Sequence, residues 1–163
     1  MAKKGTTRYR SNKQEREVAK IFGGKQVIAS GSLWFADSDV RSDKCLIECK
    51  TTENNFYPVT TKVWEKINEE AVQDHMRTPI LVVDLIDRDR YVIFNPKHFN
   101  KKLDTLKVVE TNKVTSTFRV YSWGTLAMEN PMQFSIKSTV QGKTHDLVVW
   151  TEKNFLEYFK EEL

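Results

Sequence analysis

The spacing of hydrophobic and polar residues along the chain predicts three amphipathic helices. The first spans residues 12–22 and ends at the glycine pair that follows it. The second spans residues 62–75, where apolar side chains recur every four positions. The third closes the chain and carries aromatic and aliphatic residues on one side. The residues expected to cap these helices with a hydroxyl group are Ser11, Thr60 or Thr61, and Thr151.

Shorter apolar runs between the helices predict β-strands. Residues 80–86 form a nearly continuous apolar run, which is typical of a buried central strand. Residues 91–94 are expected to pair back on that strand across a plain turn at residues 87–90. Residues 44–51 form a further strand. The remaining expected strands are residues 26–29, 39–41, 107–109, 114–121, 133–137 and 146–150.

The order of these elements favours a single α/β domain. It predicts a mixed central β-sheet flanked by helices, with an extra β-rich part toward the C-terminus. Within residues 1–163 we expect a flexible basic arm (1–10), a core (11–95), and a β-rich extension with the closing helix (96–163).

The composition is that of a soluble globular protein. Of 163 residues, 39% are hydrophobic and 29% are charged. No apolar stretch is long enough to cross a bilayer, and the basic N-terminus has no apolar segment of the kind found in secretory signals. We therefore expect a cytoplasmic protein without a membrane partner. The two cysteines, Cys45 and Cys49, are expected to be reduced core residues rather than a disulfide or a zinc site.

The positive charge is concentrated at the N-terminal end. The whole chain carries a net charge of +4, whereas residues 1–25 hold eight Lys or Arg against two Glu, which gives +6. A basic region suits a phosphodiester substrate. The alternative is a solvated basic tail without a specific partner.

A candidate chemical site lies in the strand at residues 44–51. Side chains alternate between the two faces of a strand, so Leu46, Glu48 and Lys50 share one face. Charged groups in a buried strand are costly unless they are paired or bound to a metal. Phosphodiester hydrolysis uses this combination, because carboxylates hold a divalent cation, usually Mg²⁺, and a nearby lysine orients water or stabilises charge on phosphorus.

Further carboxylates can complete such a site. Asp39 lies just upstream across a short hairpin, and Asp37 is a rival at the same loop. Glu15 lies close to the buried side of the first helix. It is expected either to approach the metal or to make a simple contact with the helix dipole.

These residues resemble the PD-(D/E)XK nucleases, and within them the archaeal-type Holliday junction resolvases and their phage-borne relatives. The resemblance covers roughly residues 8 to 95. The matching segments are Tyr9-Arg10, Glu15-Arg16-Glu17, Ser30-Gly31-Ser32, Asp39-Val40, Ile47-Glu48-Cys49-Lys50, and the helix–strand unit at residues 62–83.

The resemblance implies a restriction-endonuclease-like fold and a metal-dependent endodeoxyribonuclease. It implies Mg²⁺ as the cofactor, with Mn²⁺ as a substitute, and four-way DNA junctions as the substrate. Family members act as homodimers, which suits a two-fold substrate. The implied metal-binding acids are Glu15, Asp39 and Glu48, the implied catalytic lysine is Lys50, and the implied DNA contacts are Arg10, Arg16, Ser30 and Ser32.

Two alternatives to a junction resolvase stay open. The first is a restriction-type or nicking nuclease that acts on duplex DNA, with the β-rich region after residue 107 supplying recognition. The second is a non-catalytic DNA-binding relic of the nuclease fold. Trp34 and Phe35, between the serine turn and Asp39, are expected either to pack on the core or to stack on opened bases.

Overall fold

The structure is a computed structural model that describes residues 4–27, 38–86, 89–104, 109–110, 114–123 and 128–163. Its α-helices are α1 (Thr7–Ile21), α2 (Thr61–Gln73) and α3 (Glu152–Phe159), and short 3₁₀ turns cover Pro96–His98 and Lys160–Glu162. The strands are β1 (Lys25–Gln26), β2 (Val40–Arg41), β3 (Cys45–Thr51), β4 (Phe56–Thr60), β5 (Thr78–Asp84), β6 (Arg90–Phe94), β7 (Val109–Glu110), β8 (Thr117–Tyr121), β9 (Met132–Lys137) and β10 (Thr144–Thr151).

Eight of these strands form one mixed sheet, in the order β1-β2-β3-β5-β6-β10-β9-β7. The central neighbours β3 and β5 run parallel, with Glu48 opposite Leu81 and Thr51 opposite Asp84. Strands β7 and β9 are also parallel, and the other neighbours in the sheet are antiparallel. Strands β4 and β8 form a separate antiparallel ribbon. The predicted class, a mixed α/β domain with a central sheet and a β-rich C-terminal part, is confirmed.

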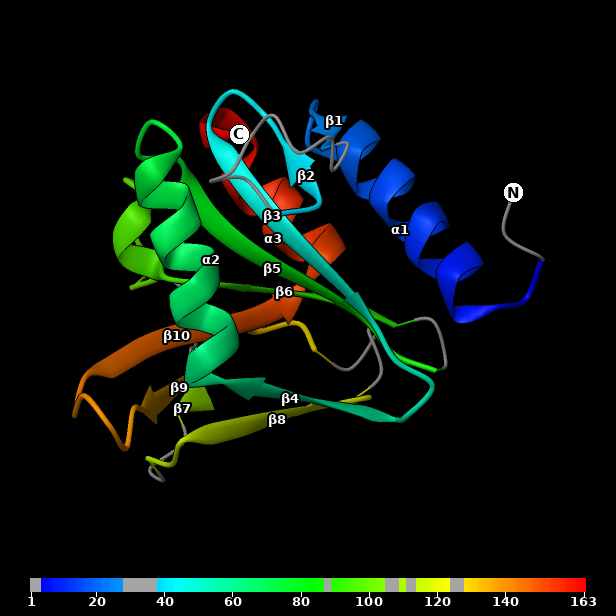
Figure 1. Ribbon diagram of the computed structural model, residues 1–163. Coiled ribbons are helices and arrows are strands. Elements are labelled where there is room, and N and C mark those ends of the chain that lie inside the picture. The colour runs from blue at the N-terminus through cyan, green and yellow to red at the C-terminus, as the bar shows by residue number, and fades with distance from the viewer. Residues whose placement is uncertain (1–3, 28–37, 87–88, 105–108, 111–113, 124–127) are drawn as a thin grey trace.

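Helices cover both faces of the sheet (Figure 1). Helices α1 and α3 pack on one face, where Val18, Phe22 and Phe155 join the side chains of Cys45 and Ile47 in a hydrophobic core. Helix α2 and the β4–β8 ribbon cover the other face. Their core side chains there include Trp64, Ile67, Val59 and Val120, packed with Leu81, Val83 and Ile93 of the sheet.

The prediction for α1 was wrong at its N-terminal end. The helix begins at Thr7, and the side chain of Thr6 caps it by accepting a hydrogen bond from the Tyr9 amide, 3.2 Å away. Residues 7–10, which were expected to belong to a flexible arm, are therefore helical, and Ser11 lies inside the helix. Thr6 and Ser11 both carry a hydroxyl group that can cap a helix. The apolar pattern begins after both residues, so it cannot show which of them is the cap.

The predicted caps of the other helices are confirmed. Thr60 Oγ1 accepts from the Val63 amide at 3.2 Å, and Thr151 Oγ1 accepts from the Asn154 amide at 3.3 Å. The expected β5–β6 hairpin is also present. Strand β5 starts two residues earlier than expected, so Pro79 lies inside it opposite Leu46. Strand β4 was not predicted.

Arg90 was expected in a plain turn, and this was wrong: it is the first residue of β6 and its side chain is only 15% exposed. Its Nε and Nη2 atoms donate to Asp84 at 2.7 and 3.0 Å. The same guanidinium reaches Glu17 of α1 at 2.7 Å and Glu152 of α3 at 3.3 Å. One guanidinium thus ties both helices on this face to the sheet.

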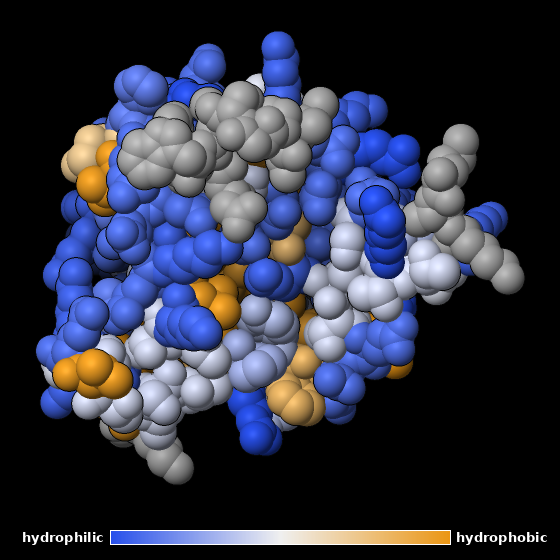
Figure 2. Space-filling view, in the orientation of Figure 1, coloured by the Kyte–Doolittle hydropathy of each residue, from blue (hydrophilic) through white to orange (hydrophobic). Residues whose placement is uncertain are grey.

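The surface on the α2 side is largely hydrophilic. Figure 2 shows this face with only small, separate apolar patches. Among the described residues, none of the helices combines the length and apolar character that crossing a membrane requires.

Candidate active site

Strand β3 separates its side chains into two chemically distinct sets, as predicted. Cys45 and Ile47 lie in the core beneath α1 and α3, with Cys49 partly buried against it. Glu48 and Lys50 belong to the opposite face, and Glu48 is only 7% exposed. An acid and an amine are therefore held together on the face that α2 and the β4–β8 ribbon share.

Asp39 immediately precedes β2, the strand that pairs with β3, and it contacts β3 beside these two residues. Its Oδ2 atom accepts a hydrogen bond from the Cys49 amide at 2.8 Å, and its own amide donates to the Ile47 carbonyl at 3.1 Å. The Asp39 carboxylate is thereby fixed at the point of the strand that lies between Glu48 and Lys50. The structure brings together these three predicted site residues.

Glu48 has one satisfied oxygen and one unsatisfied oxygen. Its Oε1 atom lies 3.0 Å from Lys50 Nζ, while its Oε2 atom is buried and has no hydrogen-bond partner. Burial, and then the nearby Asp39 charge, raise the pKa of Glu48 from 4.5 to about 7 against the opposing charges of Lys50 and Lys66. A buried carboxylate oxygen without a donor is costly, and a bound cation would satisfy it.

Lys50 is held in its charged form. Burial acts to lower the pKa of its ammonium group, but Glu48, Tyr57 and Asp39 together outweigh burial and the net change is upward. Tyr57 of β4, which was not singled out in the sequence, also lies near this pair. Burial raises the pKa of its phenol, and the charges of Lys50 and Glu48 act on it in opposite directions. Tyr57 follows β3 by only a few residues, and its alternation with Val59 in an unrecognised strand was the missed signal.

The carboxylate pair fits a hard divalent cation. Asp39 and Glu48 offer oxygen ligands, and Mg²⁺ is usually held by one or two carboxylates together with waters and substrate phosphates. Within the described residues, no three His, Cys, Asp or Glu side chains gather into a set that could hold a metal ion. The site that these residues can form is therefore an open, two-carboxylate one.

Glu15, the third predicted acid, lies on the helix that covers the opposite face of β3. Its Oε2 atom accepts a hydrogen bond from Gln26 at 3.1 Å. The pKa of the Cys49 thiol is raised, first by burial and then by the charges of Asp39 and Glu15, which places Glu15 near the Cys49 side of the strand.

The remaining residues singled out in the sequence divide into described and undescribed ones. Arg10 is partly buried and forms an ion pair with Glu53, and Arg16 is exposed on α1. Asp37, Ser30, Ser32, Trp34 and Phe35 lie outside the described residues.

Gln14 is a second residue that sequence reasoning missed. It is 1% exposed, and its Nε2 atom donates to the Lys50 carbonyl at 2.8 Å and to the Val82 carbonyl at 3.4 Å. The Gln14 side chain therefore links α1 to the parallel strands β3 and β5, and its contact on β3 is the backbone of Lys50. A buried amide on the apolar side of a helix was the signal available in the sequence.

Comparisons with known proteins include a distant structural similarity to a solved structure. No protein-family model matches the chain, and no curated protein matches it. A solved structure that is similar is Hjc, a Holliday junction resolvase from the archaeal hyperthermophile Archaeoglobus fulgidus, with 14% sequence identity and a TM-score of 0.41. The match covers 68% of this chain and 87% of that chain. At this level of similarity the function must be argued from the site itself.

Proposed function

We propose that the chain is a metal-dependent endodeoxyribonuclease that hydrolyses phosphodiester bonds at the site formed by Asp39, Glu48 and Lys50. The observation that carries the proposal is the buried, unpartnered Oε2 atom of Glu48 beside a second carboxylate and an ammonium group. A fold retains such an uncompensated group mainly where a ligand completes it.

Each residue has a distinct task in the proposed mechanism. Asp39 and Glu48 would hold Mg²⁺ or Mn²⁺, which when bound polarises a phosphoryl oxygen and lowers the pKa of water. Lys50 keeps its proton at neutral pH, because its pKa is raised. It therefore acts as a donor that orients the attacking water or stabilises charge on the phosphoryl group, and not as the general base.

For the substrate we propose four-way DNA junctions, cut by a homodimer whose two-fold axis matches that of the junction. The basic N-terminal segment, with eight Lys or Arg against two Glu in residues 1–25, favours a polyanionic partner. A nuclease that nicks duplex DNA is the alternative with the same site, and the preference between branched and linear DNA separates the two. The intact Asp39–Glu48–Lys50 set argues against a non-catalytic relic.

The metal site is tested by the binding of Mn²⁺ alone, without DNA, measured by isothermal titration calorimetry. We expect Asp39→Asn and Glu48→Gln each to weaken binding by about tenfold or more, since even outer-shell partners of a metal account for about 10- to 100-fold in affinity. Glu15→Gln is expected to weaken binding by about threefold or less, because a charge outside the site is screened.

The exposed carboxylate of Glu69 on α2 provides the matched control. Glu69→Gln should bind Mn²⁺ as the wild type does. Equal affinities for the wild type, Asp39→Asn and Glu48→Gln would show that the cation binds elsewhere. A loss with Glu15→Gln as large as that with Asp39→Asn would make Glu15 a third ligand.

A further inference from the structure

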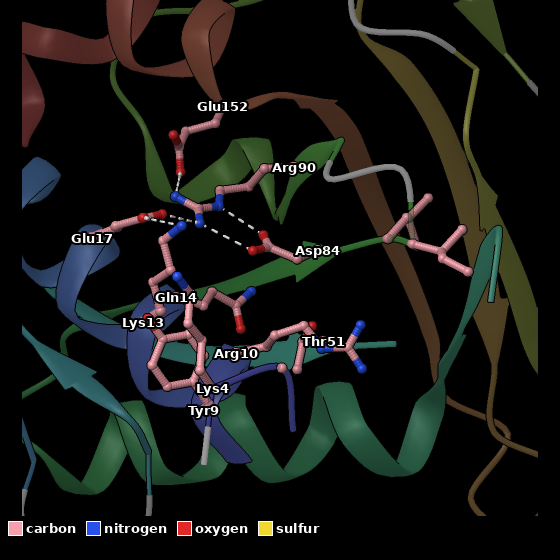
Figure 3. Close-up of a pocket in the computed structure, with 13 residues that line it drawn as sticks. Lys4, Tyr9, Arg10, Lys13, Gln14, Glu17, Thr51, Asp84, Arg90 and Glu152 are labelled. Atoms are coloured by element: carbon pink, nitrogen blue, oxygen red, sulfur yellow. Dashed lines mark hydrogen bonds and ion pairs between the residues drawn. The ribbon is translucent and has the colours of Figure 1, made fainter. Parts of the chain in front are cut away.

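A cavity of about 590 Å³ opens where the two parallel strands end (Figure 3). Thr51 and Asp84, the last residues of β3 and β5, line it together with the first three turns of α1. Ligands of α/β proteins characteristically bind beyond the carboxyl ends of parallel strands. The cavity lies on the α1 side of the sheet, so it is separate from the Glu48–Lys50 face, and Gln14 connects the two through its bond to the Lys50 carbonyl.

The floor of the cavity is rich in hydrogen-bond acceptors. The carboxylates of Asp84 and Glu152 lie there around Arg90, as Figure 3 shows. Gln14 lines the same space, and its Oε1 atom is buried without a hydrogen-bond partner. Because both Asp84 oxygens already accept from Arg90, Gln14 Oε1 is the acceptor on this floor that a ligand can satisfy. It suits a ligand with an N–H or O–H donor, such as the exocyclic amino group of a nucleobase.

The rim of the cavity is basic and aromatic. Lys4 and Lys13 are exposed at its edge, and Tyr9 and Arg10 are half-buried between rim and floor. Arg10 pairs with Glu53 through Nη2, but its Nε atom is buried and has no partner. These groups suit the phosphate and the flat ring of a nucleotide, since lysine and arginine bind phosphate and tyrosine stacks on bases.

We propose that this cavity binds one nucleotide unit, with the amino-bearing edge of the base toward Gln14 Oε1 and the phosphate toward Lys4, Arg10 and Lys13. This rests on the proposed function insofar as the nucleotide is an unpaired residue of the DNA substrate. A free nucleotide offers the same chemistry. In the first case the cavity holds a displaced nucleotide beside the strand that carries Glu48 and Lys50, and so favours branched or opened DNA.

The test is a ¹⁵N NMR titration of the full chain in EDTA. The ligands are deoxyadenosine and deoxycytidine 5′-monophosphates, a single-stranded deoxycytidine pentanucleotide, and 2-deoxyribose 5-phosphate as a ligand without a base. We expect saturable shifts at the cavity-lining residues Tyr9, Gln14, Thr51 and Leu85 with a base-bearing ligand. Tyr9→Ala and Lys13→Ala should each weaken binding by about tenfold, as the loss of one stacking or charge contact implies.

Lys20→Ala is the matched control, because Lys20 is exposed on the same helix outside the cavity. Shifts with the monophosphates identify a free-nucleotide site, and shifts with the pentanucleotide alone identify a site for a DNA strand; both support the proposal. Equal binding of the base-free ligand, or no shift at the cavity with any ligand, overturns it. The titration contains no metal, so it does not depend on the Asp39–Glu48 site. Absence of nucleotide binding by a wild-type protein that cleaves DNA with Mg²⁺ would refute the cavity alone. Nucleotide binding by a wild-type protein that does not cleave DNA would refute the endonuclease alone.

Discussion

Replacing Glu48 with glutamine is expected to stabilise the metal-free protein at pH 8 while it abolishes DNA cleavage. Glu48 is buried, and one of its oxygens has no hydrogen-bond partner. Burial and the Asp39 charge raise its pKa from 4.5 to about 7. The folded state therefore binds this proton more tightly than the unfolded chain does, and ionisation of Glu48 opposes folding.

The sign of the effect fixes its pH dependence. In the wild type, this contribution lowers the free energy of unfolding as the pH rises from about 4.5 through about 7, and the full cost is present above that range. A pKa change of this size corresponds to about 3 kcal/mol. Glutamine stays neutral at every pH but leaves Lys50 without its carboxylate partner, so we expect a net gain of about 1–3 kcal/mol at pH 8.

Urea denaturation in EDTA at pH 5 and pH 8 measures this effect. The difference between variant and wild type should grow as the pH rises, and Mg²⁺ should stabilise the wild type but not Glu48→Gln. Cleavage by the variant should fall by about a hundredfold or more. Glu69→Gln should change neither stability nor cleavage. A Glu48→Gln protein that is less stable than wild type at pH 8 without metal would show that this carboxylate serves the fold and not a ligand.

Replacing Arg90 with methionine is expected to destabilise the protein by about 3 kcal/mol at neutral pH, because it leaves the partly buried carboxylates of Asp84 and Glu152 without this partner. Asp84, Glu17 and Glu152 come from three different elements and all bond to this guanidinium. Arg90→Lys should recover only part of the loss, since an ammonium group cannot form the two parallel bonds that Asp84 accepts.

Thermal and urea unfolding of Arg90→Met at pH 4 and pH 7 test this expectation. The loss in free energy of unfolding relative to wild type should be smaller at pH 4, because protonation removes the repulsion among the carboxylates left without Arg90. Arg119→Met is the control, since Arg119 is an exposed arginine that lies over the ring of Phe56. A loss no larger for Arg90→Met than for Arg119→Met would mean that the cluster contributes nothing specific to folding.

The sequence predicted the elements whose signals are local. The alternation of Glu48 and Lys50 with apolar neighbours identified β3 and its chemical face, and the apolar run at residues 80–86 identified the buried strand β5. The threonine caps of α2 and α3 were likewise predicted, because a capping hydroxyl acts within three residues of its partner.

Features that depend on distant partners were missed. Strand β4 contains Pro58, which argues against a strand in sequence, and its partner β8 lies about sixty residues further along the chain. Arg90 and the three carboxylates around it come from four different elements, so no local pattern could reveal the cluster. The bond from Gln14 to the Lys50 carbonyl also requires the tertiary fold.

The Asp39–Glu48–Lys50 cluster is proposed to cleave DNA with a divalent cation. The most direct test incubates an end-labelled four-way junction and a matched linear duplex with Mg²⁺ or EDTA, using wild type, Asp39→Asn, Lys50→Ala and the control Glu69→Gln. We predict paired nicks in the junction with wild type and the control, lost with EDTA and with both site variants. Cleavage of the duplex to an equal extent would support the proposed site but show that four-way junctions are not the preferred substrate. Cleavage that survives EDTA, or that both site variants retain, would contradict a metal-dependent site at Asp39, Glu48 and Lys50.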